Sequence, residues 1–152
     1  MTNSVNAILS KHWNGSVPVD PIMIAKRLGA DVYASPSLDS EGQLFFEDNK
    51  PIIVYRPSGN DGRDRFTIAH EVGHLVLNHG PSLRDTNMDN IGVTNFDVKE
   101  RDANQFAAEL LMPEEKIRSA INQGITSFRP LCNHFGVSSS AMCIRLENLG
   151  IF

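Results

Sequence analysis

A segment near the middle of the chain restricts the fold more than any other. From Asp64 onward, apolar residues recur at the spacing of an α-helix, until Asn78-His79-Gly80-Pro81 ends it. The apolar face consists of Phe66, Ile68, Ala69, Val72, Leu75 and Val76. His70, Glu71 and His74 lie in the same helix. Because burying two imidazoles and a carboxylate is costly unless they are paired or bind a metal, this helix needs a partner element that completes a polar site.

His70 and His74 are four residues apart, so on a helix they lie one turn apart and roughly 40° apart around its axis. Both imidazoles can therefore reach one tetrahedral cation. Glu71 completes the arrangement H-E-x-x-H, in which the carboxylate acts as general base on a water bound to the metal. The alternative interpretation is that these are half-buried helix residues beside a solvated charge. A third ligand on another element would decide between the two interpretations.

Glu100 is the candidate for that third ligand. It opens a second strongly amphipathic helix, predicted over Lys99–Met112. Asn104 follows one turn later, where its amide can hold a ligand side chain in place. Glu109 is a rival ligand, placed further along the same helix. Alternatively, Glu100 is simply a favourable negative charge in the first turn of the helix.

The rest of the pattern predicts an α+β fold, with a small antiparallel sheet packed against several helices. Two short β-prone runs, Gln43–Glu47 and Pro51–Tyr55, flank the polar turn Asp48-Asn49-Lys50 and so indicate a hairpin. The polar stretch Ser82–Val98 is interpreted as a long connection. The other predicted elements are a helix over Asn6–Trp13, a helix over Ile22–Leu28 that Asp20 caps and Pro21 begins, a strand over Asp31–Ala34, a helix over Glu114–Asn122 and two short helices between Pro130 and Leu149.

Length, charge and cysteine content weigh against several classes of protein. The length of 152 residues is that of one ordinary domain. The net charge of −4 weighs against nucleic acid as the main ligand, since nucleic-acid binders usually carry a basic excess. The first residues have no signal-peptide pattern, and the apolar runs are far shorter than the ~20 residues that span a bilayer. With only two cysteines the chain is no disulfide scaffold, and we expect a cytoplasmic protein without a membrane partner.

The C-terminal residues 128–152 are predicted to form a helix-turn-helix-like tail that packs on a main domain of residues 1–127. Its turn is Phe135-Gly136-Val137-Ser138, with Ser138 as the cap of the second helix. Arg145 is the only basic side chain of that helix. Because phosphate contacts dominate DNA affinity, such a helix would bind DNA weakly. A helical pair that packs on the core or grips a protein partner is the favoured interpretation.

The two central motifs together resemble the ImmA/IrrE family of metallopeptidase-like proteins. The matching stretches are Arg65-Phe66-Thr67-Ile68-Ala69-His70-Glu71-Val72-Gly73-His74 and Glu100–Pro113. The segments Val17–Gly29 and Phe135–Gly150 also resemble the opening and the close that are usual in this family. The resemblance therefore covers nearly the whole chain.

This resemblance implies a zincin-like fold with a gluzincin-type site. In such a site His70, His74 and Glu100 are the metal ligands and Glu71 is the catalytic base. Zinc is the expected metal, although two histidines and one carboxylate can also hold manganese or iron.

The resemblance also implies a role in transcription regulation. Members of the family are typically encoded by bacteria or phages, and they cut or otherwise inactivate a helix-turn-helix repressor of the Xre type. We therefore expect a metal-dependent endopeptidase that makes limited cuts in such a repressor. The alternative is a protein that binds metal without proteolysis and controls an Xre-type regulator or antitoxin by sequestration, as one component of a toxin–antitoxin pair.

A substrate of such an enzyme would lie extended along an edge strand and add backbone hydrogen bonds to it. The strand Gln43–Glu47 is the candidate edge, because it precedes the metal helix and is followed by its own hairpin partner. Its substrate-binding residues would be Gln43, Leu44, Phe45 and Phe46. An ordinary core strand that buries Phe45 or Phe46 is the alternative.

Overall fold

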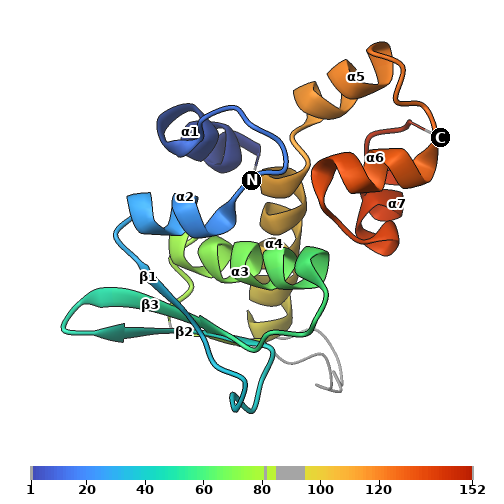
Figure 1. Ribbon diagram of the computed structural model, residues 1–152. Helices are drawn as coiled ribbons and strands as arrows, with labels where there is room; N and C mark the ends of the chain where they lie inside the picture. Colours follow the sequence, from blue (N-terminus) through green and yellow to red (C-terminus); the bar gives the residue numbers. More distant parts are fainter. Residues whose placement is uncertain (1, 81, 85–94, 152) are drawn as a thin grey trace.

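The computed structural model describes residues 2–80, 82–84 and 95–151 and has an α+β architecture (Figure 1). Figure 1 shows a small sheet covered on one face by helices, with the last three helices gathered at one end. The elements are α1 (Thr2–His12), α2 (Pro21–Arg27), β1 (Asp31–Ala34), β2 (Gly42–Glu47), β3 (Lys50–Tyr55), α3 (Asp61–Val76), β4 (Ser82–Arg84), α4 (Asn95–Leu111), α5 (Glu114–Asn122), α6 (Phe128–Phe135) and α7 (Ser139–Asn148). Among the described residues, no helix combines the length and the hydrophobicity needed to cross a bilayer.

The sheet has the strand order β1-β3-β2-β4. The predicted hairpin is present as β2 and β3, and its turn residues Asp48 and Asn49 have φ values of 52° and 65°, as a two-residue turn of type I′ requires. However, β1 pairs in parallel with β3, so the sheet is mixed and not wholly antiparallel as expected. Alternation of apolar residues identifies a strand, but it specifies neither the neighbour of that strand nor its direction.

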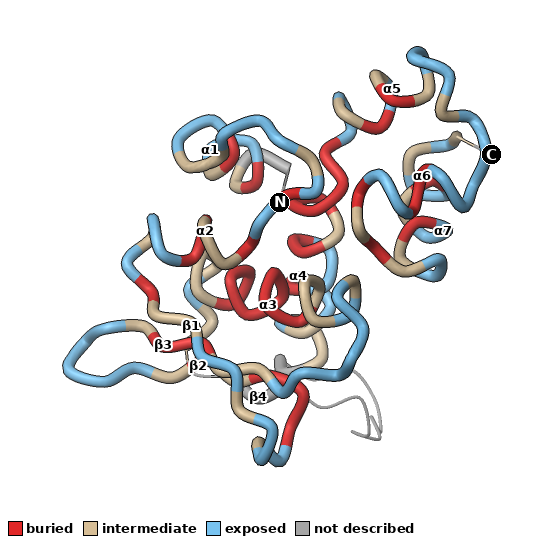
Figure 2. The backbone as a smooth tube through the Cα atoms, viewed as in Figure 1, coloured by how far each residue is buried: buried red, intermediate tan, exposed pale blue. Residues whose placement is uncertain are grey.

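Helix α3 is the central element of the fold. It lies between the sheet and α4, and residues 67–74 are all buried, as the red turns in Figure 2 show. On the sheet, Leu44 of β2 and Ile53 of β3 are paired and fully buried. Helix α3 begins at Asp61, three residues before the predicted start, because the side chain of Asn60 accepts a hydrogen bond from the backbone nitrogen of Arg63 at 3.1 Å.

Helix α4 crosses α3 at a glycine. A Cβ atom at Gly73 would lie 3.2 Å from the Cα atom of Ala103 and 3.2 Å from the Cβ atom of Phe106. The absence of a side chain at Gly73 therefore allows the two helices to approach this closely. Since Glu100 lies one turn before Ala103 on α4, the crossing also brings Glu100 to α3.

The predicted long connection over Ser82–Val98 is wrong at both ends. Residues Ser82–Arg84 form β4, and α4 begins at Asn95, four residues before its predicted start. Residues 85–94 of this stretch lie outside the described residues. The first turn of α4 is Asn95-Phe96-Asp97-Val98, in which polar and apolar residues alternate, so helical periodicity of apolar residues does not reveal it. Asp97 is a favourable charge at this helix N-terminus.

The C-terminal tail is the predicted pair of short helices. Gly136 ends α6 in the left-handed conformation, and the Ser138 hydroxyl caps α7 by accepting a hydrogen bond from the nitrogen of Ala141. Two arginines join the tail to the rest of the chain. Arg65 of α3 donates to the Gly136 carbonyl at 2.5 Å, and Arg145 of α7 donates to the carbonyl of Met112 at 2.9 Å.

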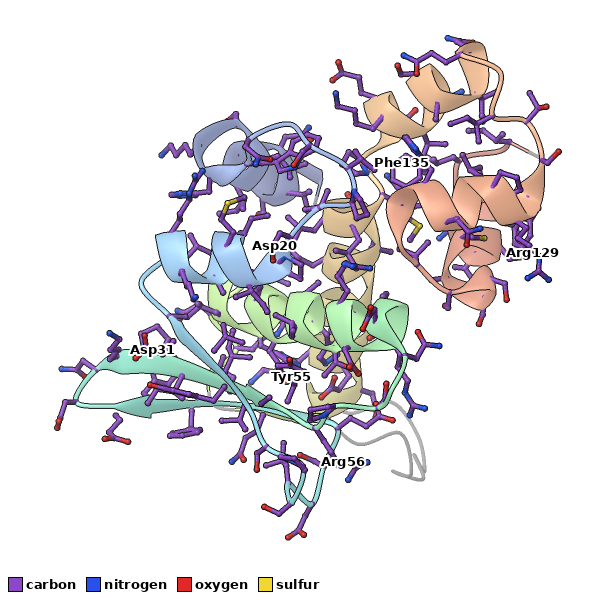
Figure 3. The ribbon with its side chains drawn as sticks, viewed as in Figure 1. Asp20, Asp31, Tyr55, Arg56, Arg129 and Phe135 are labelled. Carbon is purple, nitrogen blue, oxygen red and sulfur yellow. The ribbon has the colours of Figure 1, made fainter. Side chains whose placement is uncertain are left out.

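The hydrophobic core runs without interruption into this tail. Leu131 and Phe135 of α6 and Met142 and Leu146 of α7 belong to the same cluster of buried residues as the side chains under α3 and α4. Figure 3 shows Phe135 on the side of α6 that faces the rest of the molecule. The tail therefore packs on the preceding elements, and the division of the chain into a domain of residues 1–127 and a dependent tail of residues 128–152 stays a prediction.

Candidate metal centre

Helix α3 contributes three neighbouring polar side chains to the interior. The exposed fractions of His70, Glu71 and His74 are 0%, 0% and 2%. Their candidate ligand atoms all lie within 4.8 Å of one another. The helical spacing of these residues therefore produces the cluster that the sequence pattern predicted.

Glu100 of α4 reaches this cluster from the opposite side. Its Oε2 atom lies 2.6 Å from Nε2 of His70 and 3.4 Å from Nε2 of His74. The two Nε2 atoms are 3.0 Å apart. Two imidazole nitrogens and one carboxylate oxygen thus converge on one point between α3 and α4.

Two further side chains hold the imidazoles from behind. Nδ1 of His70 donates a hydrogen bond to Oδ1 of Asn104, 2.7 Å away. Nδ1 of His74 lies 2.9 Å from Nδ1 of His79, so one proton is shared between these two rings. With the proton of each ligand histidine on Nδ1, both Nε2 atoms present a lone pair to the point where they meet Glu100.

The chemistry of this cluster fits a divalent metal. Lone pairs at 2.6–3.4 Å from one another repel unless a cation or a proton lies between them. In addition, Oε1 of Glu100 is buried and accepts no hydrogen bond from the described residues. Two histidines and one carboxylate are the ligand set of a catalytic zinc site, which keeps its fourth position open.

The protonation states agree with metal binding. Burial raises the pKa of Glu100, but hydrogen bonds and favourable charge interactions with His70 and His74 outweigh it and lower this pKa to about 2. The carboxylate is therefore ionised at neutral pH. Burial lowers the pKa of His79, and electrostatic interactions with His74 and Lys99 lower it further. A neutral His79 can accept the hydrogen bond of His74.

Glu71 lies where α3 meets the sheet. A Cβ atom at Gly42 of β2 would lie 3.5 Å from Cγ of Glu71 and 2.7 Å from Cγ2 of Thr67, so strand and helix approach closely here. Glu71 is fully buried beside the two histidines. This position suits a carboxylate that exchanges protons with a water or substrate held at the cluster.

The strand predicted to bind substrate is an edge over only part of its length. Gly42, Gln43 and Leu44 pair with β3 on one side and with β4 on the other. Leu44 is fully buried in the core, whereas Phe46 is 43% exposed. The predicted edge is therefore wrong at Gln43 and Leu44, where β4 adds a second neighbour that its short Ser-Leu-Arg sequence does not reveal. Among the described residues, Phe45 and Phe46 pair only with β3, so their role in binding substrate stays a prediction.

The rival ligand Glu109 lies elsewhere. It is buried on α4, more than two turns beyond Glu100, and its charge acts on Arg145 of α7. His79 is the residue that the sequence analysis did not assign to the site. It follows Asn78, which has a φ of 59° and turns the chain back toward α3. The signal in the sequence that could have identified His79 was a histidine directly after the end of the metal-binding helix.

We compared the chain with known proteins. No curated protein matched it. A transcriptional regulator of Mycobacterium tuberculosis has a similar structure, with a TM-score of 0.67 and 18% sequence identity. The similarity covers 96% of this chain and 46% of the regulator, so this chain spans about half of the regulator's length.

The family model of peptidase M78, described as the IrrE N-terminal-like domain, matches residues 25–147. This match includes α3, α4 and every residue of the cluster. The chain therefore belongs to the ImmA/IrrE family of metallopeptidases, and its α+β fold carries a metallopeptidase-like domain.

Proposed function

We propose that this protein is a zinc-dependent endopeptidase that makes limited cuts in an Xre-type helix-turn-helix repressor and so relieves repression. The observation that carries the proposal is the convergence of His70, His74 and Glu100, with their ligand atoms 2.6–3.4 Å apart, beside the buried Glu71. A purely structural ion pair would need neither a second histidine nor a buried second carboxylate.

The residues of the site would have three roles: binding the metal, orienting its ligands and transferring a proton. His70, His74 and Glu100 would hold the ion, and Asn104 and His79 would keep the imidazoles in the binding tautomer. When bound, the metal acts as a Lewis acid that activates a water and polarises a peptide carbonyl. Glu71 takes a proton from the water as the oxygen of the water bonds to the carbonyl carbon. Glu71 then gives this proton to the amide nitrogen as the carbon–nitrogen bond breaks.

A role in transcription regulation is supported by the structural neighbour. That protein is named a transcriptional regulator, and this chain corresponds to about half of it. In that regulator a domain with this fold is combined with further segments, which supports a role of the peptidase domain in controlling transcription. In this chain the partner repressor would be reached through protein–protein contact.

The substitution Glu71→Gln tests the proposal. We expect the purified wild-type protein to cut a co-purified Xre-type repressor encoded beside it at one or two bonds, identified by mass spectrometry. The variant should bind one zinc ion per chain, measured by elemental analysis, but cut at least a hundredfold more slowly, because the proton acceptor is lost. Glu47→Gln, at an exposed position on β2, is the matched control and should cut at the wild-type rate.

Sequestration is the other outcome of this experiment. If Glu71→Gln relieves repression in cells as fully as the wild type, cleavage is not the activity, and the protein controls its regulator by binding alone. Full cleavage by Glu71→Gln in vitro would likewise contradict the proposal.

A further inference from the structure

A long groove lies on the face of α4 that is turned away from the sheet. Its volume is about 1620 Å³. Helix α4 forms the floor, α1 and α7 line the two sides, and α5 lies at one end (Figure 1). An α-helix with a diameter of ~10 Å and three to four turns fills roughly 1,300–1,700 Å³, so the groove has room for one such helix.

The walls of the groove offer apolar contacts. Trp13, which follows α1, is half-buried on one side. Ile144 of α7 lines the other side and is 57% exposed, one of only four large apolar side chains exposed to this degree in the described part of the chain. Ala108 on the floor is small and half-buried. Aromatic and aliphatic side chains around a small residue are the arrangement that receives the apolar face of an amphipathic helix.

Basic residues outnumber acidic residues along the groove, although the chain is negative overall. Five of the fourteen Lys and Arg residues line it, against three of the eighteen Asp and Glu residues. Of these basic residues, Arg118 pairs with Glu114 at 2.9 Å, Arg63 pairs with Glu41, and Arg145 donates to the carbonyl of Met112. Lys116 lies over the ring of Trp13. Arg101 projects from the floor and forms no hydrogen bond or ion pair with the described residues. This guanidinium is available to an acidic side chain of a partner.

The groove is also adjacent to the metal centre. Asn104, whose Oδ1 atom accepts the hydrogen bond of His70, lies on the floor one turn from Arg101. A segment bound in the groove would therefore lie directly behind one of the candidate metal ligands. The reacting bond would lie on the other side of α4, so the groove can hold a partner without blocking the cluster.

We infer that this groove is a docking site for an acidic amphipathic helix of the partner repressor, separate from the segment that is cut. The inference rests on the proposed function, since the partner is the substrate proposed above. The apolar face of the helix packs between Trp13 and Ile144, and an acidic side chain pairs with Arg101. Docking at a site away from the cleaved bond would raise the local concentration of the substrate. It would also limit cleavage to the partner that carries the helix.

Two substitutions on the groove and two matched controls test this inference. Ile144→Arg removes the exposed apolar contact, and Arg101→Glu reverses the free charge. The controls are Tyr33→Arg on β1, where the side chain is 55% exposed, and Arg129→Glu on α6, which projects away from α4 in Figure 3. Neither control residue lines the groove. Each variant is compared with the wild type by circular dichroism to verify that it is folded.

Binding and cleavage are measured separately. Binding of the intact repressor is measured in the Glu71→Gln background, which cannot consume it, by isothermal titration calorimetry. We expect each groove variant to weaken this binding and to raise the KM for the intact repressor at least tenfold. A short peptide that spans the cleaved bond but lacks the acidic helix should be cut equally, within twofold, by the wild type and by all four variants.

The results distinguish the inference from the function on which it rests. Groove variants that bind and cut the repressor like the controls would overturn the docking site while leaving the peptidase intact. Binding that the groove variants weaken, without any cleavage by the wild type, would support the docking site and contradict the peptidase. Absence of repressor binding by the wild type, or self-association of the chain that Ile144→Arg abolishes in sedimentation, would overturn the docking inference.

Discussion

Asn104 lies on the exposed face of α4, yet its Oδ1 atom holds the proton of the buried His70 on Nδ1. His79 has the same relation to His74 from beyond the end of α3. A neutral imidazole offers a metal only the nitrogen that carries no proton. At the scale of single residues, the affinity of the cluster for metal therefore depends on side chains that do not themselves reach the ion.

Replacing Asn104 by leucine should weaken zinc binding by 10–100-fold, because the hydrogen bond that orients His70 is lost. The measurement is a competition titration with a chromophoric chelator. Gln105→Leu, the same kind of change at the next exposed position of α4, should leave the affinity within threefold of the wild type. Equal affinities of the two variants would show that Asn104 does not position the ligand.

At the scale of elements, the crossing of α3 and α4 assembles the site. Glu100 is on a different helix from the two histidines, and its distance to them depends on how closely the helices approach. The approach is set at Gly73, whose missing side chain leaves room for the backbone of Ala103. The glycine is therefore a requirement of the metal site as well as of packing.

The substitution Gly73→Val tests this requirement. The added side chain would meet the backbone of Ala103, which cannot move aside as a flexible side chain does, and should lower the free energy of unfolding by about 1–3 kcal/mol. Zinc affinity should fall as well, because α4 carries Glu100 away from His70. Ala7→Val on the exposed face of α1 is the control, and urea denaturation with the chelator titration is the measurement. If the variant is destabilised but its zinc affinity is unchanged, Gly73 is required for helix packing and not for the metal site.

The position of the tail also depends on individual side chains, of which Arg145 is one. Arg145, the only basic residue of α7, is half-buried and donates to the carbonyl of Met112 at the end of α4. Burial lowers its pKa, against the raising effect of the nearby Glu109 and Glu114 charges. The guanidinium that would have contacted a DNA phosphate is thus used to attach the tail.

Arg145→Ala should lower the free energy of unfolding by about 1.5–3 kcal/mol, since it removes a charge-assisted hydrogen bond and leaves the buried Glu109 without its neighbouring positive charge. Arg129→Ala, at an exposed position on α6, should change stability by less than about 0.5 kcal/mol. Both are measured by urea denaturation. Two equal and small changes would mean that Arg145 contributes nothing to docking of the tail.

At the scale of the whole molecule, the metal would act as a ligand of the folded state. Helices α3 and α4 are both inside the single hydrophobic core, so a metal that joins them resists opening of the entire fold. A free zinc concentration of one hundred times Kd adds about 2.7 kcal/mol to the free energy of unfolding. For a chain of this size that corresponds to an increase of roughly 5–11 °C in Tm.

Removal of metal with a chelator should therefore lower Tm by this amount, and added zinc should restore it. Differential scanning calorimetry is the measurement. In Glu100→Ala the third ligand is absent, so neither treatment should shift Tm by more than about 1 °C. A wild-type Tm that is the same with and without metal would contradict a metal that bridges α3 and α4.

Local structure and the chemical character of the site could be predicted from the sequence. Helical spacing put His70, Glu71 and His74 together, Asp20 and Ser138 marked helix starts, and the turn at Asp48-Asn49 marked a hairpin, because each depends on a few neighbouring residues. Segments that lack such periodicity were interpreted wrongly, as at β4 and the first turn of α4.

The tertiary structure was needed to show how distant segments meet. It placed β1 parallel to β3, gave β2 a second neighbour, brought Glu100 within 2.6 Å of His70 and turned His79 back onto His74. It also opened the groove between α1 and α7. These features depend on strand order and on how closely helices cross, which are set by packing of the whole core and leave no periodic signal in any one segment.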